Sequence, residues 1–178
     1  MQLWLVGSGK QVKKNLISPG GETTVTSLDW LNDGRLLLAG RENKTLQIWD
    51  WLRAEKIDDL WAYAPVERGR FSPDGSLVIA AAECRTIFVW RRVECERQGA
   101  IIDQGDHVLL LDSRGNYQLD ASARPDIFFV AQTSAGQLLL TPAEFAARFG
   151  WANHPEVVKF TASAGAAAIS APAATAGE

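Results

Sequence analysis

The chain has 178 residues, with 18 basic and 21 acidic side chains and a formal net charge of −3. This length allows one domain, or one domain followed by a tail. The mixed charges argue against nucleic acid as a partner, because nucleic-acid-binding proteins carry a basic patch that pairs with phosphates. No run of about 18 apolar residues occurs, so we expect no membrane-spanning helix and no membrane partner.

The cysteines and the N-terminus together favour a cytoplasmic location. The two cysteines, Cys84 and Cys95, give no disulfide framework, so we predict two free thiols in a reducing compartment. The first ten residues lack a basic start followed by a long apolar core, and therefore do not read as a secretory signal.

The first predicted elements are two short strands, at residues 3–6 and 11–16, joined by a glycine-containing turn. The Gly-Ser-Gly-Lys run in this turn does not meet the phosphate-loop motif, which needs Gly-x4-Gly-Lys-Ser/Thr at the start of a helix. A plain hairpin turn is therefore preferred to a nucleotide site. Trp4 in the first strand lies 45 residues before Trp49.

An internal repeat follows, because residues 25–49 align with residues 66–90 without a gap. A repeat of about 40–45 residues built from short strands is typical of β-propeller blades. The predicted fold class is therefore mostly β, a partial β-propeller. Eight aligned positions are identical: Val25/Val66, Asp33/Asp74, Gly34/Gly75, Leu36/Leu77, Ala39/Ala80, Glu42/Glu83, Thr45/Thr86 and Trp49/Trp90.

Each copy predicts strand, tight turn, strand, turn and strand. Residues 72–75, Ser-Pro-Asp-Gly, suit a type I turn, and residues 31–34 suit the same turn less well. The apolar run 77–82 predicts a strand that is buried on both faces. Residues 86–90 are rich in β-branched and aromatic side chains, which favour another strand.

These motifs resemble the WD (Trp-Asp) repeat of the β-propeller family. Trp49-Asp50 matches the dipeptide that gives the family its name, whereas the second copy has Trp90-Arg91. No Gly-His dipeptide precedes either copy, and Asn43 and Cys84 stand where the family usually has Asp. The resemblance therefore implies a partial polar network inside each blade and blades softer than the consensus. The structural repeat positions that it implies are Asp33, Gly34, Thr45, Trp49, Asp74, Gly75, Thr86 and Trp90.

The last third of the chain departs from this repeat. Apolar runs at 108–111, 127–132 and 137–140 predict strands, and no Trp-Asp follows them. A helix is predicted at 142–149, because Thr141 and Glu144 can form a capping box around Pro142. This part resembles the tail that follows the last repeats of large bacterial WD-repeat proteins, and we interpret it as a degenerate terminal unit.

The predicted organisation therefore has five parts. Residues 161–178 are rich in alanine, lack aromatic residues and are expected to be disordered. The parts are the end of a preceding blade (1–17), two WD-repeat blades (23–61 and 64–104), the degenerate terminal β unit with its helix (105–160) and the disordered tail (161–178).

No pattern in the sequence indicates catalysis, a metal or a cofactor. His107 and His154 have no partner at ligand spacing, and the adjacent Asp58 and Asp59 should point to opposite faces of a strand. A thiol nucleophile at Cys84 or Cys95 is disfavoured. Three tryptophans outside the repeat position are interpreted as packing residues rather than a ligand platform: Trp51, Trp61 and Trp151.

The leading interpretation is a non-catalytic protein-interaction scaffold, because function in such folds lies in loops on a rigid frame. The alternative is the C-terminal regulatory part of a larger bacterial signalling enzyme, such as a kinase, peptidase-like or NTPase protein. A propeller hydrolase would need carboxylates or histidines that converge on a central channel. A propeller typically has about four to eight blades, so we expect protein partners or self-association to complete the open array.

Overall fold

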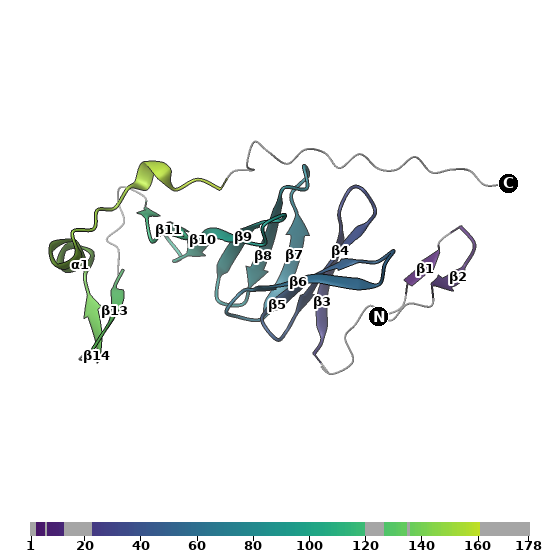
Figure 1. The fold of residues 1–178 in the computed structure, drawn as a ribbon, viewed down its shortest axis with the longest axis horizontal. Helices are drawn as coiled ribbons and strands as arrows, with labels where there is room; N and C mark the ends of the chain where they lie inside the picture. The colour runs from purple at the N-terminus through teal and green to yellow at the C-terminus, as the bar shows by residue number, and fades with distance from the viewer. Residues whose placement is uncertain (1–2, 6, 13–22, 120–126, 135, 161–178) are drawn as a thin grey trace. The chain divides into compact units, whose positions relative to one another are not determined.

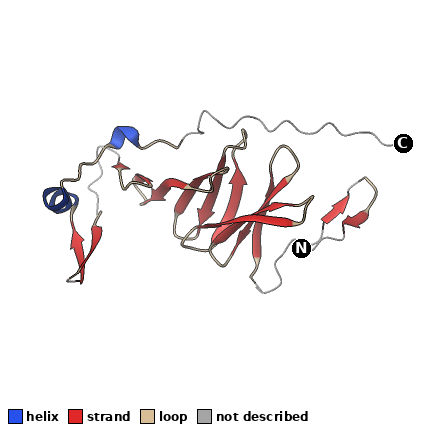
Figure 2. Cartoon of the chain, viewed as in Figure 1, coloured by secondary structure: helices blue, strands red, loops and turns tan. Residues whose placement is uncertain are grey.

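The computed structural model describes residues 3–5, 7–12, 23–119, 127–134 and 136–160. They divide into two compact units. Unit 1 holds the described residues up to Ala100 together with Phe160, and unit 2 holds those from Ile101 to Lys159. Strands dominate both (Figure 2). The tail expected to be disordered lies outside the described residues.

The N-terminal strands form a two-stranded antiparallel sheet. Strand β1 (Leu3–Leu5) pairs with β2 (Lys10–Val12), and Trp4 stands opposite Gln11. Gly9 has φ +61°, a left-handed conformation that glycine adopts without steric cost. Residues 7–9 therefore form a turn between the two strands, and most of the predicted second strand lies outside the described residues.

The first repeat forms a four-stranded antiparallel sheet, blade 1. Its strands are β3 (Val25–Trp30), β4 (Leu36–Arg41), β5 (Thr45–Asp50) and β6 (Glu55–Trp61), hydrogen-bonded in chain order. All residues of β4 and β5 are buried, because both strands lie in the middle of the sheet and carry large apolar side chains.

The second repeat builds blade 2 from four consecutive strands of a six-stranded antiparallel sheet: β7 (Val66–Phe71), β8 (Leu77–Ala82), β9 (Thr86–Arg91) and β10 (Arg97–Asp103). The boundary between the units falls inside β10. The strand registers of the two blades correspond, since Trp49 stands opposite Leu37 and Trp90 opposite Val78. Neither blade contains a helix among its described residues.

The turns between the first and second strands of the two blades have the same geometry. The Gly34 amide donates to the Leu31 carbonyl at 2.8 Å, and the Gly75 amide donates to the Ser72 carbonyl at 2.8 Å. Both glycines have positive φ, +67° and +70°, which explains why the two copies share Asp-Gly at this point.

Blade 2 packs on blade 1 through the inner strands β3 and β7 (Figure 1). A Cβ atom added to Gly69 of β7 would lie 2.6 Å from Leu46 Cδ2, so glycine permits this close approach. The prediction that β8 is buried on both faces is only half right. Val78, Ala80 and Ala82 on the side toward blade 1 are buried, whereas the alternate residues of β8 are half-buried.

Unit 2 contains two hairpins and a helix. Its strands are β11 (Val108–Asp112), β12 (Tyr117–Gln118), β13 (Phe129–Thr133) and β14 (Gly136–Leu140). Helix α1 spans Pro142–Phe149 and is followed by the short helix η1 (Pro155–Val157). Strand β13 begins two residues later than the apolar run suggests, and unit 2 begins four residues before the terminal part expected from the sequence.

Aromatic side chains from separate elements hold unit 2 together. Phe129 of β13 stacks on Phe145 of α1 with ring centroids 4.5 Å apart, and Trp151 lies 4.9 Å from Phe129. The Asn153 side chain makes two hydrogen bonds with the backbone of Tyr117, at 2.8 and 2.9 Å. These contacts fix the segment after α1 against β12, and Tyr117 also stacks near Trp151.

Candidate protein-interaction surface

The repeat positions implied by the sequence are structural elements of the blades. Asp33 and Asp74 lie in the turns between the first and second strands of the blades, and their carboxylates accept backbone N–H groups two residues later. Trp49 and Trp90 are 5% and 2% exposed, so both indoles belong to the core. All four residues make contacts within their own blade. They set the frame on which exposed side chains are held.

The polar network of blade 1 consists of separate short links. Thr45 Oγ1 donates to Asn43 Oδ1 at 2.7 Å. The Trp49 indole N–H donates to Gln47 Oε1 at 3.3 Å, and Gln47 Nε2 donates to Asp59 Oδ1 at 2.9 Å. Thr45 and Trp49 are thus tied to different partners.

Blade 2 has a simpler arrangement at the same positions. Thr86 Oγ1 donates to the backbone carbonyl of Cys84 at 3.2 Å. Phe88 stands where blade 1 has Gln47, and its ring packs near Trp90 with centroids 5.9 Å apart. In blade 2, the apolar ring of Phe88 therefore takes the place of the Gln47 amide, which links two strands in blade 1.

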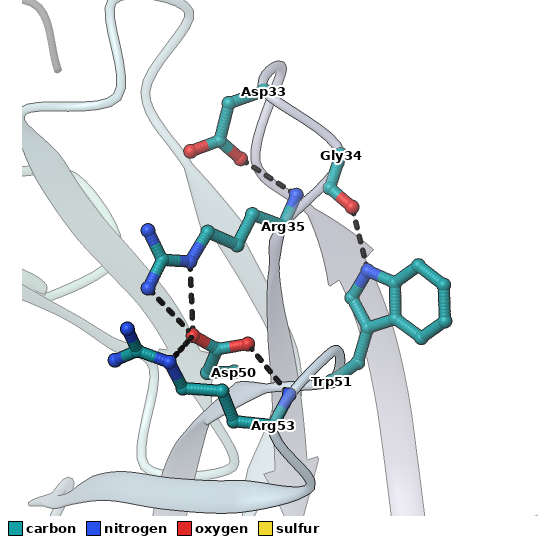
Figure 3. Close-up of polar contacts among 6 residues, drawn as sticks. All are labelled: Asp33, Gly34, Arg35, Asp50, Trp51 and Arg53. Atoms are coloured by element: carbon teal, nitrogen blue, oxygen red, sulfur yellow. Dashed lines mark hydrogen bonds and ion pairs between the residues drawn. The ribbon is translucent and has the colours of Figure 1, made fainter. Parts of the chain in front are cut away.

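Asp50 is the centre of a charged cluster with Arg35 and Arg53 in blade 1 (Figure 3). Arg35 Nε donates to Asp50 Oδ2 at 2.9 Å, and the Arg53 amide donates to Asp50 Oδ1 at 3.1 Å. Burial alone would raise the pKa of the Asp50 carboxyl, but the Arg53 amide and the Arg35 guanidinium together hold it below its usual value. Asp50 therefore stays ionised and fastens the turn after β5 to the turn before β4.

Two side chains of β3 connect blade 1 to blade 2. Ser27 Oγ accepts the Gly69 amide at 2.9 Å, and Asp29 Oδ2 accepts the Phe71 amide at 2.8 Å. Asp29 Oδ1 also pairs with Arg70 Nη1 at 2.7 Å. We call Ser27 and Asp29 the inter-blade latch. The repeat alignment contains a signal for it, because Asp29 and Arg70 occupy the same repeat position with opposite charges, but sequence reasoning missed it.

The opposite side of β3 has apolar side chains exposed to solvent. Leu28 and Trp30 are 45% and 41% exposed, and Thr26 is also exposed. Side chains alternate along a strand, so these three residues face away from blade 2 while the latch faces it. We call Thr26, Leu28 and Trp30 the open face of blade 1. The Trp30 ring meets Trp51 edge to face, with centroids 5.9 Å apart.

The tryptophans expected to serve in packing behave differently from one another. Trp51 packs against Leu37 and Trp49, and its indole N–H donates to the Gly34 carbonyl at 2.6 Å (Figure 3). Trp151 belongs to the aromatic cluster of unit 2. The packing interpretation is wrong for Trp61, which is 60% exposed because it ends the outermost strand of blade 1.

Two observations bear on the metal and thiol chemistry of the described residues. No three His, Cys, Asp or Glu side chains among them come together as a metal site. Burial raises the pKa of the Cys95 thiol to about 12, and the nearby Asp58 carboxylate adds to this effect. The thiol stays protonated at neutral pH, and only the thiolate is a nucleophile. Among the described helices, none is long and apolar enough to span a bilayer.

Comparison with known proteins agrees with the architecture. The family model "WD domain, G-beta repeat" matches residues 9–50 and 64–91. A solved structure entitled "Structure of U3-55K" matches with a TM-score of 0.51 and 16% sequence identity, over 66% of this chain and 41% of that chain. The match therefore spans less than half of that chain. No curated protein sequence matches. With its repeats, registers and turns, this chain is similar to the WD-repeat family over residues 9–50 and 64–91 and has the fold of a partial β-propeller.

Proposed function

We propose that the chain is a non-catalytic scaffold for protein–protein interaction and that the open face of blade 1 is part of its binding surface. The observation that carries this proposal is a difference between equivalent positions. Gly69 of blade 2 is buried, Phe71 is half-buried and blade 1 accepts both of their amides, whereas their counterparts Leu28 and Trp30 are 45% and 41% exposed. Exposed aromatic and aliphatic residues grouped on a rigid element are typical of interaction sites.

The chemistry of the blades favours binding over catalysis. Two carboxylates of blade 1 are paired with basic side chains of the same blade, Asp50 with Arg35 and Asp59 with Lys56. Unpaired cysteines, Cys84 and Cys95, fit a reducing cytoplasm. The partner is a protein, because a sheet face with apolar side chains is best covered by another packed element.

Photo-crosslinking from single positions in the full chain tests this function. A crosslinking amino acid is placed at position 28 of the open face, and a matched control carries it at position 57, where Ile57 is about as exposed on the outer strand β6. In cells of the source organism, position 28 should capture a defined protein that position 57 does not. Trp30→Lys in the position-28 chain should abolish that product. Equal products from both positions would contradict the proposal.

A further inference from the structure

The backbone amides of Leu28 and Trp30 point away from the other strands of blade 1. The Leu31 amide donates to the Leu36 carbonyl at 3.0 Å, so it points toward β4. Amides alternate in direction along a strand that has one antiparallel neighbour. The Asp29 amide therefore points toward β4, whereas the amides of Leu28 and Trp30 point outward from the inner edge of blade 1.

Blade 2 shows what such amides bind. The Ser72 amide donates to the Leu77 carbonyl at 3.0 Å, so the amides of Gly69 and Phe71 point outward by the same alternation. They donate to Ser27 and Asp29, the inter-blade latch, at 2.9 and 2.8 Å. The side-chain oxygens of two residues that lie two positions apart on β3 thus accept the outward amides of β7.

We propose that the open face of blade 1 binds a β-strand of a partner protein that carries a hydroxyl residue and a carboxylate residue two positions apart, in the order Ser/Thr-x-Asp/Glu. The hydroxyl accepts the Leu28 amide and the carboxylate accepts the Trp30 amide, as the latch does for Gly69 and Phe71. This inference rests on the proposed scaffold function and specifies the chemistry of its partner.

The side chain of Leu28 adds a steric requirement. Gly69 has no side chain, and a Cβ added there would lie 2.6 Å from Leu46 Cδ2 and 3.2 Å from Leu38 Cδ2. Leu28 fills the equivalent space on blade 1. The partner must therefore have small residues where blade 1 has Leu38 and Leu46, and Leu38 stands directly opposite the latch Asp29.

A second copy of this chain stacked through blade 2 does not meet these requirements. Arg68 and Arg70 occupy the blade 2 positions equivalent to Ser27 and Asp29. A guanidinium donates hydrogen bonds and accepts none. Such a copy would leave the Leu28 and Trp30 amides without acceptors, so the inference commits to a different protein.

A designed hairpin serves as the probe. It is a synthetic peptide of residues 24–41 with Leu38→Ala, which retains Ser27 and Asp29 and removes the clash with Leu28. The control peptide also has Ser27→Ala and Asp29→Ala. Amide hydrogen exchange is measured by NMR on the full-length chain. In the free chain, Leu28 and Trp30 should exchange faster than Gly69 and Phe71.

The probe should slow exchange at Leu28 and Trp30 by about tenfold, the effect of one ordinary hydrogen bond, and the control peptide should not. Equal protection by both peptides, or protection by neither, would overturn the inference. So would amides of Leu28 and Trp30 that are already as protected as Gly69 and Phe71 in the free chain. If position 28 gives a specific crosslink but the probe and control peptides protect the amides equally, the scaffold function stands. Only the requirement for Ser/Thr-x-Asp/Glu is then overturned.

Discussion

Trp51 and Arg92 occupy the same position in consecutive blades, and each donates a side-chain N–H to the carbonyl of the turn glycine 17 residues before it. An indole makes this bond to Gly34 and a guanidinium makes it to Gly75. The two blades thus tie the turn that follows the third strand to the turn that precedes the second strand. The same hydrogen bond therefore recurs in both blades, although a different type of residue donates it.

Replacing Trp51 with phenylalanine tests this tie. Trp51→Phe keeps an aromatic ring beside Leu37 and removes the N–H that Gly34 accepts. We expect a loss of about 0.5–1.5 kcal/mol in the free energy of unfolding, the usual value of one hydrogen bond. Trp61→Phe is the control, because that ring is 60% exposed. Chemical denaturation measures both, and equal midpoints would show that the bond contributes nothing.

Gly69 determines how closely the blades approach. Gly69→Ala places a Cβ 2.6 Å from Leu46 Cδ2, and the blades must separate or the leucine must move. Overpacking of this kind typically costs about 1–3 kcal/mol. Gly7→Ala is the matched control, since no atom lies within 4 Å of its added Cβ. Calorimetry should give a lower melting temperature for Gly69→Ala alone.

Asp74 should titrate far below an ordinary aspartate. The hydroxyls of Ser72 and Ser76, followed by the Ser76 amide, hold the pKa of Asp74 at about 2. A folded-state pKa below the unfolded value of 3.8 means that the carboxylate stabilises the turn above that pH. This stabilisation is lost as pH falls from the unfolded value toward the folded one. Ser72→Ala should raise the pKa in an NMR titration, and an unchanged value would contradict the assigned cause.

The capping box of α1 should control how often the helix opens. Thr141 Oγ1 accepts the Glu144 amide at 3.3 Å, and the Glu144 carboxylate accepts the Thr141 amide at 2.8 Å. Thr141→Ala should cost about 0.5–2 kcal/mol, which accelerates amide exchange in α1 by about 2- to 30-fold. Glu144→Gln retains an acceptor for the Thr141 amide and should have the smaller effect. No acceleration for Thr141→Ala would show that the cap is not formed in solution.

The isolated chain should associate weakly or bind a hydrophobic dye. Leu28 and Trp30 leave apolar surface in water, and a blade normally relies on its neighbours to cover such surface. Light scattering should therefore show an apparent mass that rises with concentration, or a dye should bind where the chain stays monomeric. A monomer at every concentration, with sharp cooperative unfolding and no dye binding, would contradict this expectation.

The blades could be predicted from the sequence because their determinants are local and repeated. Asp-Gly turns and buried tryptophans recur 41 residues apart, as Gly34/Gly75 and Trp49/Trp90 show, and each recurrence reinforces the same register. The bounds expected for the helix at 142–149 agree with α1 because capping residues act within one turn.

Other features depend on partners that are distant in the sequence. Phe129, Phe145 and Trp151 share no period, so their cluster could not be read from a pattern. The exposure of Leu28 was missed for a related reason. Sequence marks Leu28 as an apolar strand residue, and it is exposed because it lies on the face of β3 that points away from blade 2.

The two hydrogen bonds between Asn153 and Tyr117 determine what the edge of β12 offers to another strand. A strand edge with free N–H and C=O groups is a template on which further chains can add. Asn153 gives Tyr117 the donor and the acceptor that an incoming strand would supply, at 2.9 and 2.8 Å. One carboxamide thus occupies the backbone groups of Tyr117 at the edge of β12. The outward amides of Leu28 and Trp30 on blade 1 stay available to a partner strand.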